Sequence, residues 1–270
     1  MAGEQEALDR LVEAVREGAK YRAIAPELVR SVGARELAKG RGLRETVKAT
    51  RNKLHQMVGA YIEGEPRYDR WLADLTAAYA TGDPAEIRRV SAAVMRHHAS
   101  TRERLPILDQ FYATLFSRLP PIRRVLDVAC GLNPLALPWI PLAEGAEYVA
   151  CDVDAAMVGF LGDFLALTPI TGRAVVRDIV ADPPTEPADL ALVLKAIPCL
   201  EQLDKAAGTR LLDALNAPYL LVSFPARSLG GRQRGMVEHY GAHFAELVAG
   251  RGWEVEELAF GSEVAFLVTR

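Results

Sequence analysis

Five short apolar runs, separated by segments of helix length, occupy the second half of the chain and limit the folds open to it. They lie at 123–128, 147–152, 173–177, 189–195 and 218–224. Strand-length runs that alternate with helical segments are typical of a mainly parallel sheet covered by helices on both faces. Two closing runs, 253–258 and 264–269, lie close together and predict an antiparallel edge pair. The expected fold class is therefore α/β, with a seven-stranded, mainly parallel sheet.

The first 120 residues predict helices. Apolar residues recur at the spacing of one helical face in three places: Leu8, Leu11, Val12 and Val15; Leu43, Val47, Leu54 and Val58; and Ile87, Val90 and Val94. The tetrapeptide Asp83-Pro84-Ala85-Glu86 predicts a helix start, in which the aspartate caps the helix and the glutamate caps back. Pro106 lies too deep in the segment 100–119 for one uninterrupted helix, so we expect a break near it.

Positive charge is concentrated near the N-terminus, although the net charge of the chain is −3. Residues 1–104 contain 19 Lys and Arg against 15 Asp and Glu, and residues 16–53 alone contain 11 against 4. The basic residues of this segment include Lys20, Arg22, Arg30, Arg35, Lys39, Arg41, Arg44, Lys48, Arg51 and Lys53. Two explanations stay open, a solvated helical face and a surface that binds phosphate groups.

Composition favours a protein of a reducing compartment. Half of the 270 residues are hydrophobic, which is enough for a core without disulfide staples. Cys130, Cys151 and Cys199 match neither a disulfide framework nor the spacing of a zinc site. The first residues carry acids where a secretory peptide needs a basic start and an apolar run, and no stretch approaches a membrane span. We therefore expect a soluble cytoplasmic protein with no bound metal.

The loop after the first predicted strand is the first place to look for a ligand. In open α/β sheets, ligands bind beyond the carboxyl ends of the strands, where the strand order reverses. The loop reads Asp127-Val-Ala129-Cys-Gly131-Leu-Asn133-Pro134, and its small residues Ala129 and Gly131 allow the backbone to approach a ligand closely. No GK[ST] follows, which excludes a P-loop. Gly131 is the only glycine of the loop, so the dinucleotide pattern GxGxxG is absent as well.

Acids that end the next two predicted strands outline a nucleoside site. Asp152 ends the second strand, where a carboxylate can accept both ribose hydroxyls. Asp178 and Ile179 end the third, and offer an acceptor for an exocyclic amine and an apolar neighbour for a purine face. Each acid alone is weak evidence, because an acid at such a place can instead cap the following helix. Together they predict an adenosine site without phosphate donors, as S-adenosylmethionine (SAM) requires.

Several longer motifs carry a family resemblance. They are ASTRERLPILDQFY (99–112), LDVACGLNPLALPW (126–139), YVACDVDA (148–155), LVLKAIPCLEQ (192–202) and SFPARSLGGRQRGM (223–236). From about residue 20 onward, the chain resembles the aminoglycoside-resistance 16S rRNA methyltransferases that modify guanine N7 in the ribosomal decoding site. The resemblance implies a Rossmann-like SAM-dependent methyltransferase domain, here 105–270, behind a helical N-terminal domain that docks on the small ribosomal subunit, here 1–104.

The resemblance also implies roles for single residues. Arg104, in STRERLP, is expected to pair with the methionyl carboxylate of SAM, and Ala129 and Gly131 to line its backbone path. The ribose is expected on Asp152, and the adenine between Asp178 and Ile179. The wider SAM-enzyme pattern prefers glycine at Ala129 and has a last glycine where Asn133-Pro134 stand here. Both departures are shared with the resembled family.

The substrate side is expected beyond the fourth and fifth strands. Lys195, counted with the cofactor-binding residues, and Glu201 would stand there, together with Arg227, Arg232 and Arg234 of the glycine-containing loop SLGGRQRGM. For Lys195 an alternative stays open, a lysine whose stem packs while its ammonium reaches water. Lys20, Arg22, Lys48, Arg51 and Lys53 are the expected RNA contacts of the helical domain.

The expected chemistry needs no catalytic acid or base. Guanine N7 carries a lone pair and no proton, so catalysis can rest on alignment of the two reacting atoms. The expected partner is 16S rRNA in the assembled 30S subunit, with the base turned out of its stack. We expect a monomer that does not bind membranes, and S-adenosylhomocysteine as product. Adenine-N1 methylation of 16S rRNA, a small-molecule SAM methyltransferase and a non-catalytic SAM- or RNA-binding protein stay open as alternatives.

Overall fold

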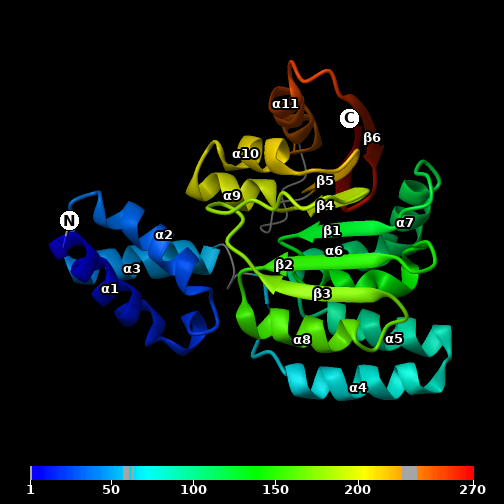
Figure 1. Ribbon diagram of the computed structural model, residues 1–270, viewed down its shortest axis with the longest axis horizontal. Helices are drawn as coiled ribbons and strands as arrows, with labels where there is room; N and C mark the ends of the chain where they lie inside the picture. Colours follow the sequence, from blue (N-terminus) through cyan, green and yellow to red (C-terminus); the bar gives the residue numbers. More distant parts are fainter. Residues whose placement is uncertain (1, 57–60, 63, 227–235) are drawn as a thin grey trace.

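The computed structural model describes residues 2–56, 61–62, 64–226 and 236–270. A twisted sheet lies at its centre, with helices on both faces, and a separate group of three helices projects from one end (Figure 1). The helices are α1 Ala2–Arg16, α2 Pro26–Leu37, α3 Leu43–Leu54, α4 Tyr68–Thr81, α5 Pro84–Met95, α6 Ala99–Arg104, α7 Leu108–Phe116, α8 Ala155–Leu165, α9 Ile197–Leu203, α10 Ala207–Ala214 and α11 Met236–Val248.

The seven strands follow the order β3-β2-β1-β4-β5-β7-β6. Their bounds are β1 Arg124–Val128, β2 Glu147–Asp152, β3 Thr171–Val176, β4 Leu190–Leu194, β5 Tyr219–Pro225, β6 Glu254–Ala259 and β7 Glu263–Thr269. The strands β1 to β5 pair in parallel, and β7 pairs antiparallel with both β5 and β6. The strand order reverses between β1 and β4, which confirms the predicted α/β sheet and places its switch point after β1.

Alternate residues of the central strands feed two cores. Val125 of β1 packs toward α4, α5, α7 and α8, whereas Leu126 and Val128 pack toward the face covered by α9, α10 and α11. All five residues of β4 are buried, as expected for a strand covered on both faces. The helices on each face thus hold the carboxyl ends of β1 and β4 side by side at one edge of the sheet.

The helices α1, α2 and α3 form a small core of their own, built around Leu11, Leu28 and Leu54. The segment before α2 joins this unit to the sheet, because Ala25 N–H donates to the Val153 carbonyl and Ala155 N–H to that of Ala23. In contrast, α4, α5 and α7 contribute to the core on one face of the sheet. The hydrophobic cores thus divide before α4, and the boundary after residue 104 for the docking domain stays a prediction.

Two local predictions can be checked directly. A 3₁₀ turn at Leu105–Ile107 separates α6 from α7, so the break predicted at Pro106 is confirmed. The cap of α5 is confirmed at Asp83, whose carboxylate accepts from Ala85 N–H at 3.0 Å. The reciprocal cap by Glu86 was wrong, because that carboxylate pairs with Arg89. Among the residues that the structure describes, no helix combines the length and hydrophobicity needed to cross a bilayer.

Candidate functional site

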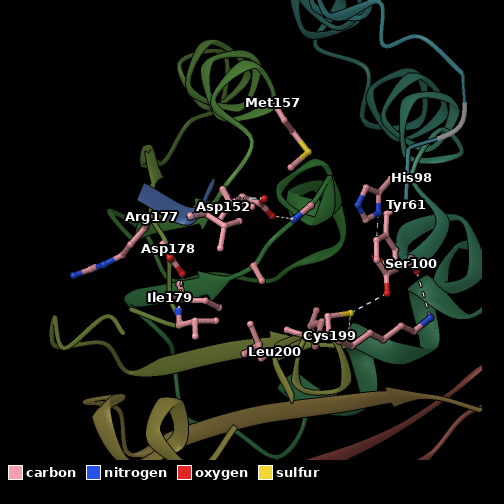
Figure 2. Close-up of a pocket in the computed structure, with 18 of the residues that line it drawn as sticks. Tyr61, His98, Ser100, Asp152, Met157, Arg177, Asp178, Ile179, Cys199 and Leu200 are labelled. Atoms are coloured by element: carbon pink, nitrogen blue, oxygen red, sulfur yellow. Dashed lines mark hydrogen bonds between the residues drawn. The ribbon is translucent and has the colours of Figure 1, made fainter. Parts of the chain in front are cut away.

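The carboxyl ends of β1 and β4 both end in strained backbone. Ala129 has a φ of 51° and Lys195 a φ of 60°, values that residues with a Cβ adopt at a cost of about 1–2 kcal/mol each. Both residues line the same cavity, which lies at the switch point of the sheet (Figure 2). Strain of this kind persists where the surrounding structure enforces it, and it concentrates at functional sites.

Gly131 brings the loop after β1 against His98. Its φ is 50°, and a Cβ there would lie 2.7 Å from Cε1 of the His98 ring. His98 is buried, stacks on Tyr61 and shares a hydrogen bond with Ser100 through Nδ1. Burial, with the nearby charges of Arg104, Lys195 and Arg102, lowers its pKa to about 4. The ring is therefore neutral at physiological pH and forms an uncharged wall of the cavity.

Asp152 ties the ends of β1 and β2 together. Its carboxylate accepts from Gly131 N–H at 2.9 Å and from Val153 N–H at 2.7 Å. Burial raises the pKa of Asp152, and these backbone donors oppose the shift because they favour the charged form. The carboxylate thus faces the cavity in a fixed orientation and can accept hydrogen bonds from the hydroxyl groups of a ligand.

Asp178 has a buried acceptor that the protein leaves unused. Its Oδ1 accepts from Val180 N–H at 3.0 Å, while Oδ2 is buried without a hydrogen-bond partner. A buried acceptor left unpaired costs about 1–3 kcal/mol, so a ligand donor at this place would be favoured. Ile179 lies beside it in the cavity lining and supplies an apolar surface (Figure 2).

The cavity as a whole suits a nucleoside that carries no phosphate groups. The space between its walls is about 810 Å³, including the part open to solvent. Asp152, Asp178 and Ile179 lie on one side, and Tyr61, His98 and Ser100 on the opposite side (Figure 2). Leu28 of α2 also contributes to the lining, so the three-helix unit closes part of the wall. The residues present therefore fit the ribose and adenine of SAM.

Arg104 lies beneath this cavity and does not line it. Only 1% exposed, its guanidinium donates to both carboxylate oxygens of Glu263 on β7, and to Oδ1 of Asn133 at 2.9 Å. Burial would raise the pKa of Glu263, but the charges of Arg104 and Lys195 outweigh that effect and lower it. The contact of Arg104 with a methionyl carboxylate stays a prediction, since its donors serve internal partners here.

Lys195 stands between two acids. Its Nζ lies 2.8 Å from Oε2 of Glu103 on α6 and 3.3 Å from Oε2 of the buried Glu263. The side chain is 5% exposed, so the interpretation of an ammonium that reaches water was wrong. Lys195 borders a second cavity as well, and Tyr61, Ser100 and Cys199 line that cavity too. Lys195 thus lies between the cavity at the switch point and the second cavity at the carboxyl ends of β4 and β5.

The basic residues predicted for RNA binding fall into two groups. Lys20, Arg22 and Lys48 are exposed. Arg51 instead donates to the carbonyls of Ala14 and Val15 at the end of α1, and Lys53 donates to the carbonyl of Gln202 at 3.3 Å. These two side chains hold parts of the protein together, which basic charge in a sequence does not reveal.

Of the remaining predicted substrate residues, the structure describes Glu201 alone. The carboxylate of Glu201 pairs with Nε2 of His243 on α11 at 2.8 Å and is absent from both cavity linings. Arg227, Arg232 and Arg234 lie outside the described residues. Sequence reasoning missed Tyr61, His98, Glu103 and Glu263 as parts of the site. Only Glu103 had a signal, its place in the STRERLP motif beside Arg104.

A family model and curated relatives match nearly the whole chain. The model described as "Ribosomal RNA methyltransferase (FmrO)" matches residues 17–267. A protein of Frankia casuarinae named "16S rRNA (guanine(1405)-N(7))-methyltransferase" is 41% identical, with 100% of this chain and 96% of the relative aligned. A protein of Serratia marcescens with the same name is 36% identical, over 93% of this chain and 94% of its own length.

Solved structures agree in fold over the same length. The 16S rRNA methyltransferase RmtF, in complex with S-adenosyl-L-homocysteine, is 32% identical with a TM-score of 0.84 and covers 98% of both chains. The 16S rRNA methylase RmtB is 30% identical with a TM-score of 0.79, over 97% of this chain and 98% of its own. The similarity thus includes the three-helix unit as well as the sheet.

Proposed function

Because the chain belongs to the family of FmrO-type ribosomal RNA methyltransferases, we propose that it transfers the methyl group of SAM to N7 of guanine 1405 of 16S rRNA. This modification would confer aminoglycoside resistance. The relatives described above carry the guanine-N7 name, which favours this target over adenine N1 and over a small molecule. The sequence resemblance to 16S rRNA methyltransferases is confirmed by these comparisons.

The structural observation that carries the proposal is the lining of the cavity at the switch point. Its unpartnered buried acceptor at Asp178 Oδ2 suits the exocyclic amine of adenine, and Ile179 suits the ring face. The Asp152 carboxylate suits the ribose hydroxyls. Ala129 and Gly131 leave the backbone bare beside it, and Lys195 borders the same space. We assign these residues to the cofactor, with Arg104 on the carboxylate side.

The protein's part in the reaction is to position the two reacting groups and to exclude water from them. SAM supplies an electrophilic methyl group on a sulfonium, so the residues of this chain need to move no proton. The neutral His98 wall adds no positive charge next to the donor, and the buried Glu263 offsets Arg104 and Lys195. Alignment of the methyl donor with the acceptor nitrogen can accelerate such a transfer without an acid or a base.

The three-helix unit is the proposed docking surface for the assembled 30S subunit. Lys20, Arg22 and Lys48 are exposed on it and can contact phosphates. The unit joins the loop after Asp152 through the backbone pairing of 23–25 with 153–155, so docking and the cofactor pocket share a wall. We propose that the enzyme acts in the cytoplasm as a monomer.

A labelled-methyl assay on purified 30S subunits tests this function. We expect one labelled methyl group per subunit, which mass mapping of the rRNA places at N7 of guanine 1405. Naked 16S rRNA should accept much less. Cells that express the protein should tolerate gentamicin and kanamycin, as a cheaper readout.

The matched variants are Asp152→Asn and Asp163→Asn, the second being exposed on α8. The first should weaken SAM binding about tenfold or more, because a charge-assisted acceptor is lost. The second should bind as the wild type does in calorimetry. Wild-type protein that binds SAM yet leaves guanine 1405 unmethylated in 30S subunits would disprove the proposed target.

A further inference from the structure

A second cavity opens beside the cofactor pocket, at the carboxyl ends of β4 and β5. Tyr61, Ser100, Lys195 and Cys199 border both spaces, so the two are neighbours. Its other walls come from Glu103, Pro198, Pro225, Met236 and Tyr240, among others. Flat and apolar side chains therefore surround one ion pair. This composition suits a planar, polar-edged ligand more than a charged or a purely apolar one.

The ion pair places an ammonium and a carboxylate side by side. The ammonium also lies 3.5 Å from the Ser100 carbonyl, so an acceptor atom of a ligand would take the place of that longer contact. Lys195 Nζ lies 2.8 Å from Glu103 Oε2. The Glu103 side chain is 35% exposed, whereas that of Lys195 is 5% exposed and is held from behind by Glu263. The positive φ of Lys195 fixes the start of this side chain at the end of β4. The order from the cofactor pocket outward is therefore ammonium first, carboxylate second.

We propose that this second cavity receives the target guanine, with Glu103 accepting from N1–H and the 2-amino group and Lys195 donating to O6; the assignment rests on the proposed function. A guanine has its O6 next to N7 on one edge and its two donors on the adjoining edge. With N7 toward the cofactor pocket, O6 meets the residue that borders both cavities, and N1 and N2 meet the residue that borders only the second.

The same pair disfavours adenine. Adenine carries an amine at position 6 and a lone pair at N1, so each would meet a group of the same kind, donor against donor and acceptor against acceptor. Groups that are mispaired in this way lose their hydration and gain no hydrogen bond in return, so adenine would bind and react much less well than guanine. Glu103 and Lys195 together would therefore be specificity-determining residues.

Glu103 also has an electrostatic role in this arrangement. Methylation forms the N7–C bond and breaks the S–C bond, and the positive charge passes from the sulfur to the guanine ring. The N1–H and 2-amino donors become stronger as that charge develops. Their hydrogen bonds to a carboxylate tighten toward the transition state, which raises the rate of the chemical step as well as the affinity.

If Glu103 had only a structural role, as the partner of Lys195, the rate would not depend on the 2-amino group of the base. Inosine separates the two roles because it keeps O6, N1–H and N7 and lacks only the 2-amino group. The experiment uses 30S subunits reconstituted with guanosine or inosine at position 1405. Wild-type enzyme should lose about 10–100-fold in kcat/KM on inosine, the contribution of one hydrogen bond to a charged group.

Three variants complete the experiment. Glu103→Ala should methylate both subunits slowly and at equal rates, and Glu103→Gln should keep part of the preference through its single acceptor. Lys195→Met should slow both equally and keep the guanosine-to-inosine ratio, since both bases carry O6. Glu254→Ala, at an exposed position of β6, is the matched control and should behave as wild type.

The outcomes separate this proposal from the function on which it rests. Equal wild-type rates on guanosine and inosine, or a Glu103→Ala enzyme that keeps the wild-type ratio, would overturn the assignment and leave the function intact. No methylation of guanosine subunits by wild type would overturn the function itself. S-adenosylhomocysteine binding by the two Glu103 variants and the Glu254 control, measured by calorimetry, shows that their cofactor pocket has folded; for Lys195→Met, thermal unfolding gives that check.

Discussion

The contact between Gly131 and His98 shows how one missing Cβ shapes the cofactor loop. We predict that Gly131→Ala destabilises the wild type by more than the 1–2 kcal/mol expected for a Cβ at positive φ, because the new methyl would lie 2.7 Å from the His98 ring. In a His98→Ala background only the backbone cost of about 1–2 kcal/mol should remain. Urea unfolding of the four proteins measures the coupling.

The size of that coupling free energy is the test. If Gly131→Ala costs the same free energy with and without the His98 ring, the close contact does not limit the loop. The affinity of the Gly131→Ala, His98→Ala double variant for S-adenosylhomocysteine shows whether the loop still holds a ligand once the glycine and the His98 ring are both absent.

Asp127 offers a second prediction at this scale, since it is a buried acid at the end of β1. Its Oδ2 accepts from Asn133 and Tyr148, while Oδ1 is buried without a partner. Burial raises its pKa from 3.8 to about 7. Between those values the folded state binds the extra proton, so the stability contributed by protonated Asp127 is lost as the pH rises from 3.8 to about 7.

The substitution Asp127→Asn removes this titration. We expect the unfolding free energy of the variant to depend less steeply on pH over that interval. Relative to wild type, the variant should therefore be most stable at pH 8, where Asp127 is ionised. Urea unfolding at a series of pH values gives the two curves. Parallel curves would mean that Asp127 titrates normally in the folded protein.

Among the elements, the three-helix unit depends on a cation at the end of α1. Arg51 of α3 donates to the carbonyls of Ala14 and Val15 in the last turn of α1, and the Val15 carbonyl also accepts from Gly18 N–H at 3.3 Å. We predict that Arg51→Ala lowers stability by about 1–3 kcal/mol, the value of a lost hydrogen bond to a charged group. Hydrogen exchange of the α1 amides should rise together with the loss in thermal stability.

Lys48 is the internal control for this prediction. It lies on the same helix and is exposed, so Lys48→Ala should leave the exchange of α1 unchanged. A loss of ribosome methylation without loss of stability in Arg51→Ala would instead restore Arg51 to the RNA contacts expected from the sequence.

At the scale of the whole molecule, docking on the 30S subunit should depend on salt. Charge reversal at Lys48 should weaken binding and reduce the slope of log affinity against log salt by about one, because one phosphate contact is lost. Arg123 is exposed just before β1, at the opposite edge of the sheet from the cavity, and its reversal is the control. Equal effects of the two reversals on subunit binding would argue against the docking surface.

Much of the architecture could be predicted because it follows local rules. The strands lie within two residues of the predicted runs, and the antiparallel closing pair is present, although β7 lies inside the sheet between β5 and β6. Ala129, Gly131, Asp152, Asp178 and Ile179 line one cavity because the carboxyl ends of parallel strands meet at one edge.

The sequence by itself determined the alternation of strands and helices, the loop after β1 and the acids that follow β2 and β3, because each depends on neighbours in the chain. Only the tertiary structure decided which charges meet. Arg104 pairs with Glu263 across 159 positions, and Glu103 with Lys195 across 92. The energy of such pairs depends on distance and burial, which are set when the helices before the sheet pack on its last strands.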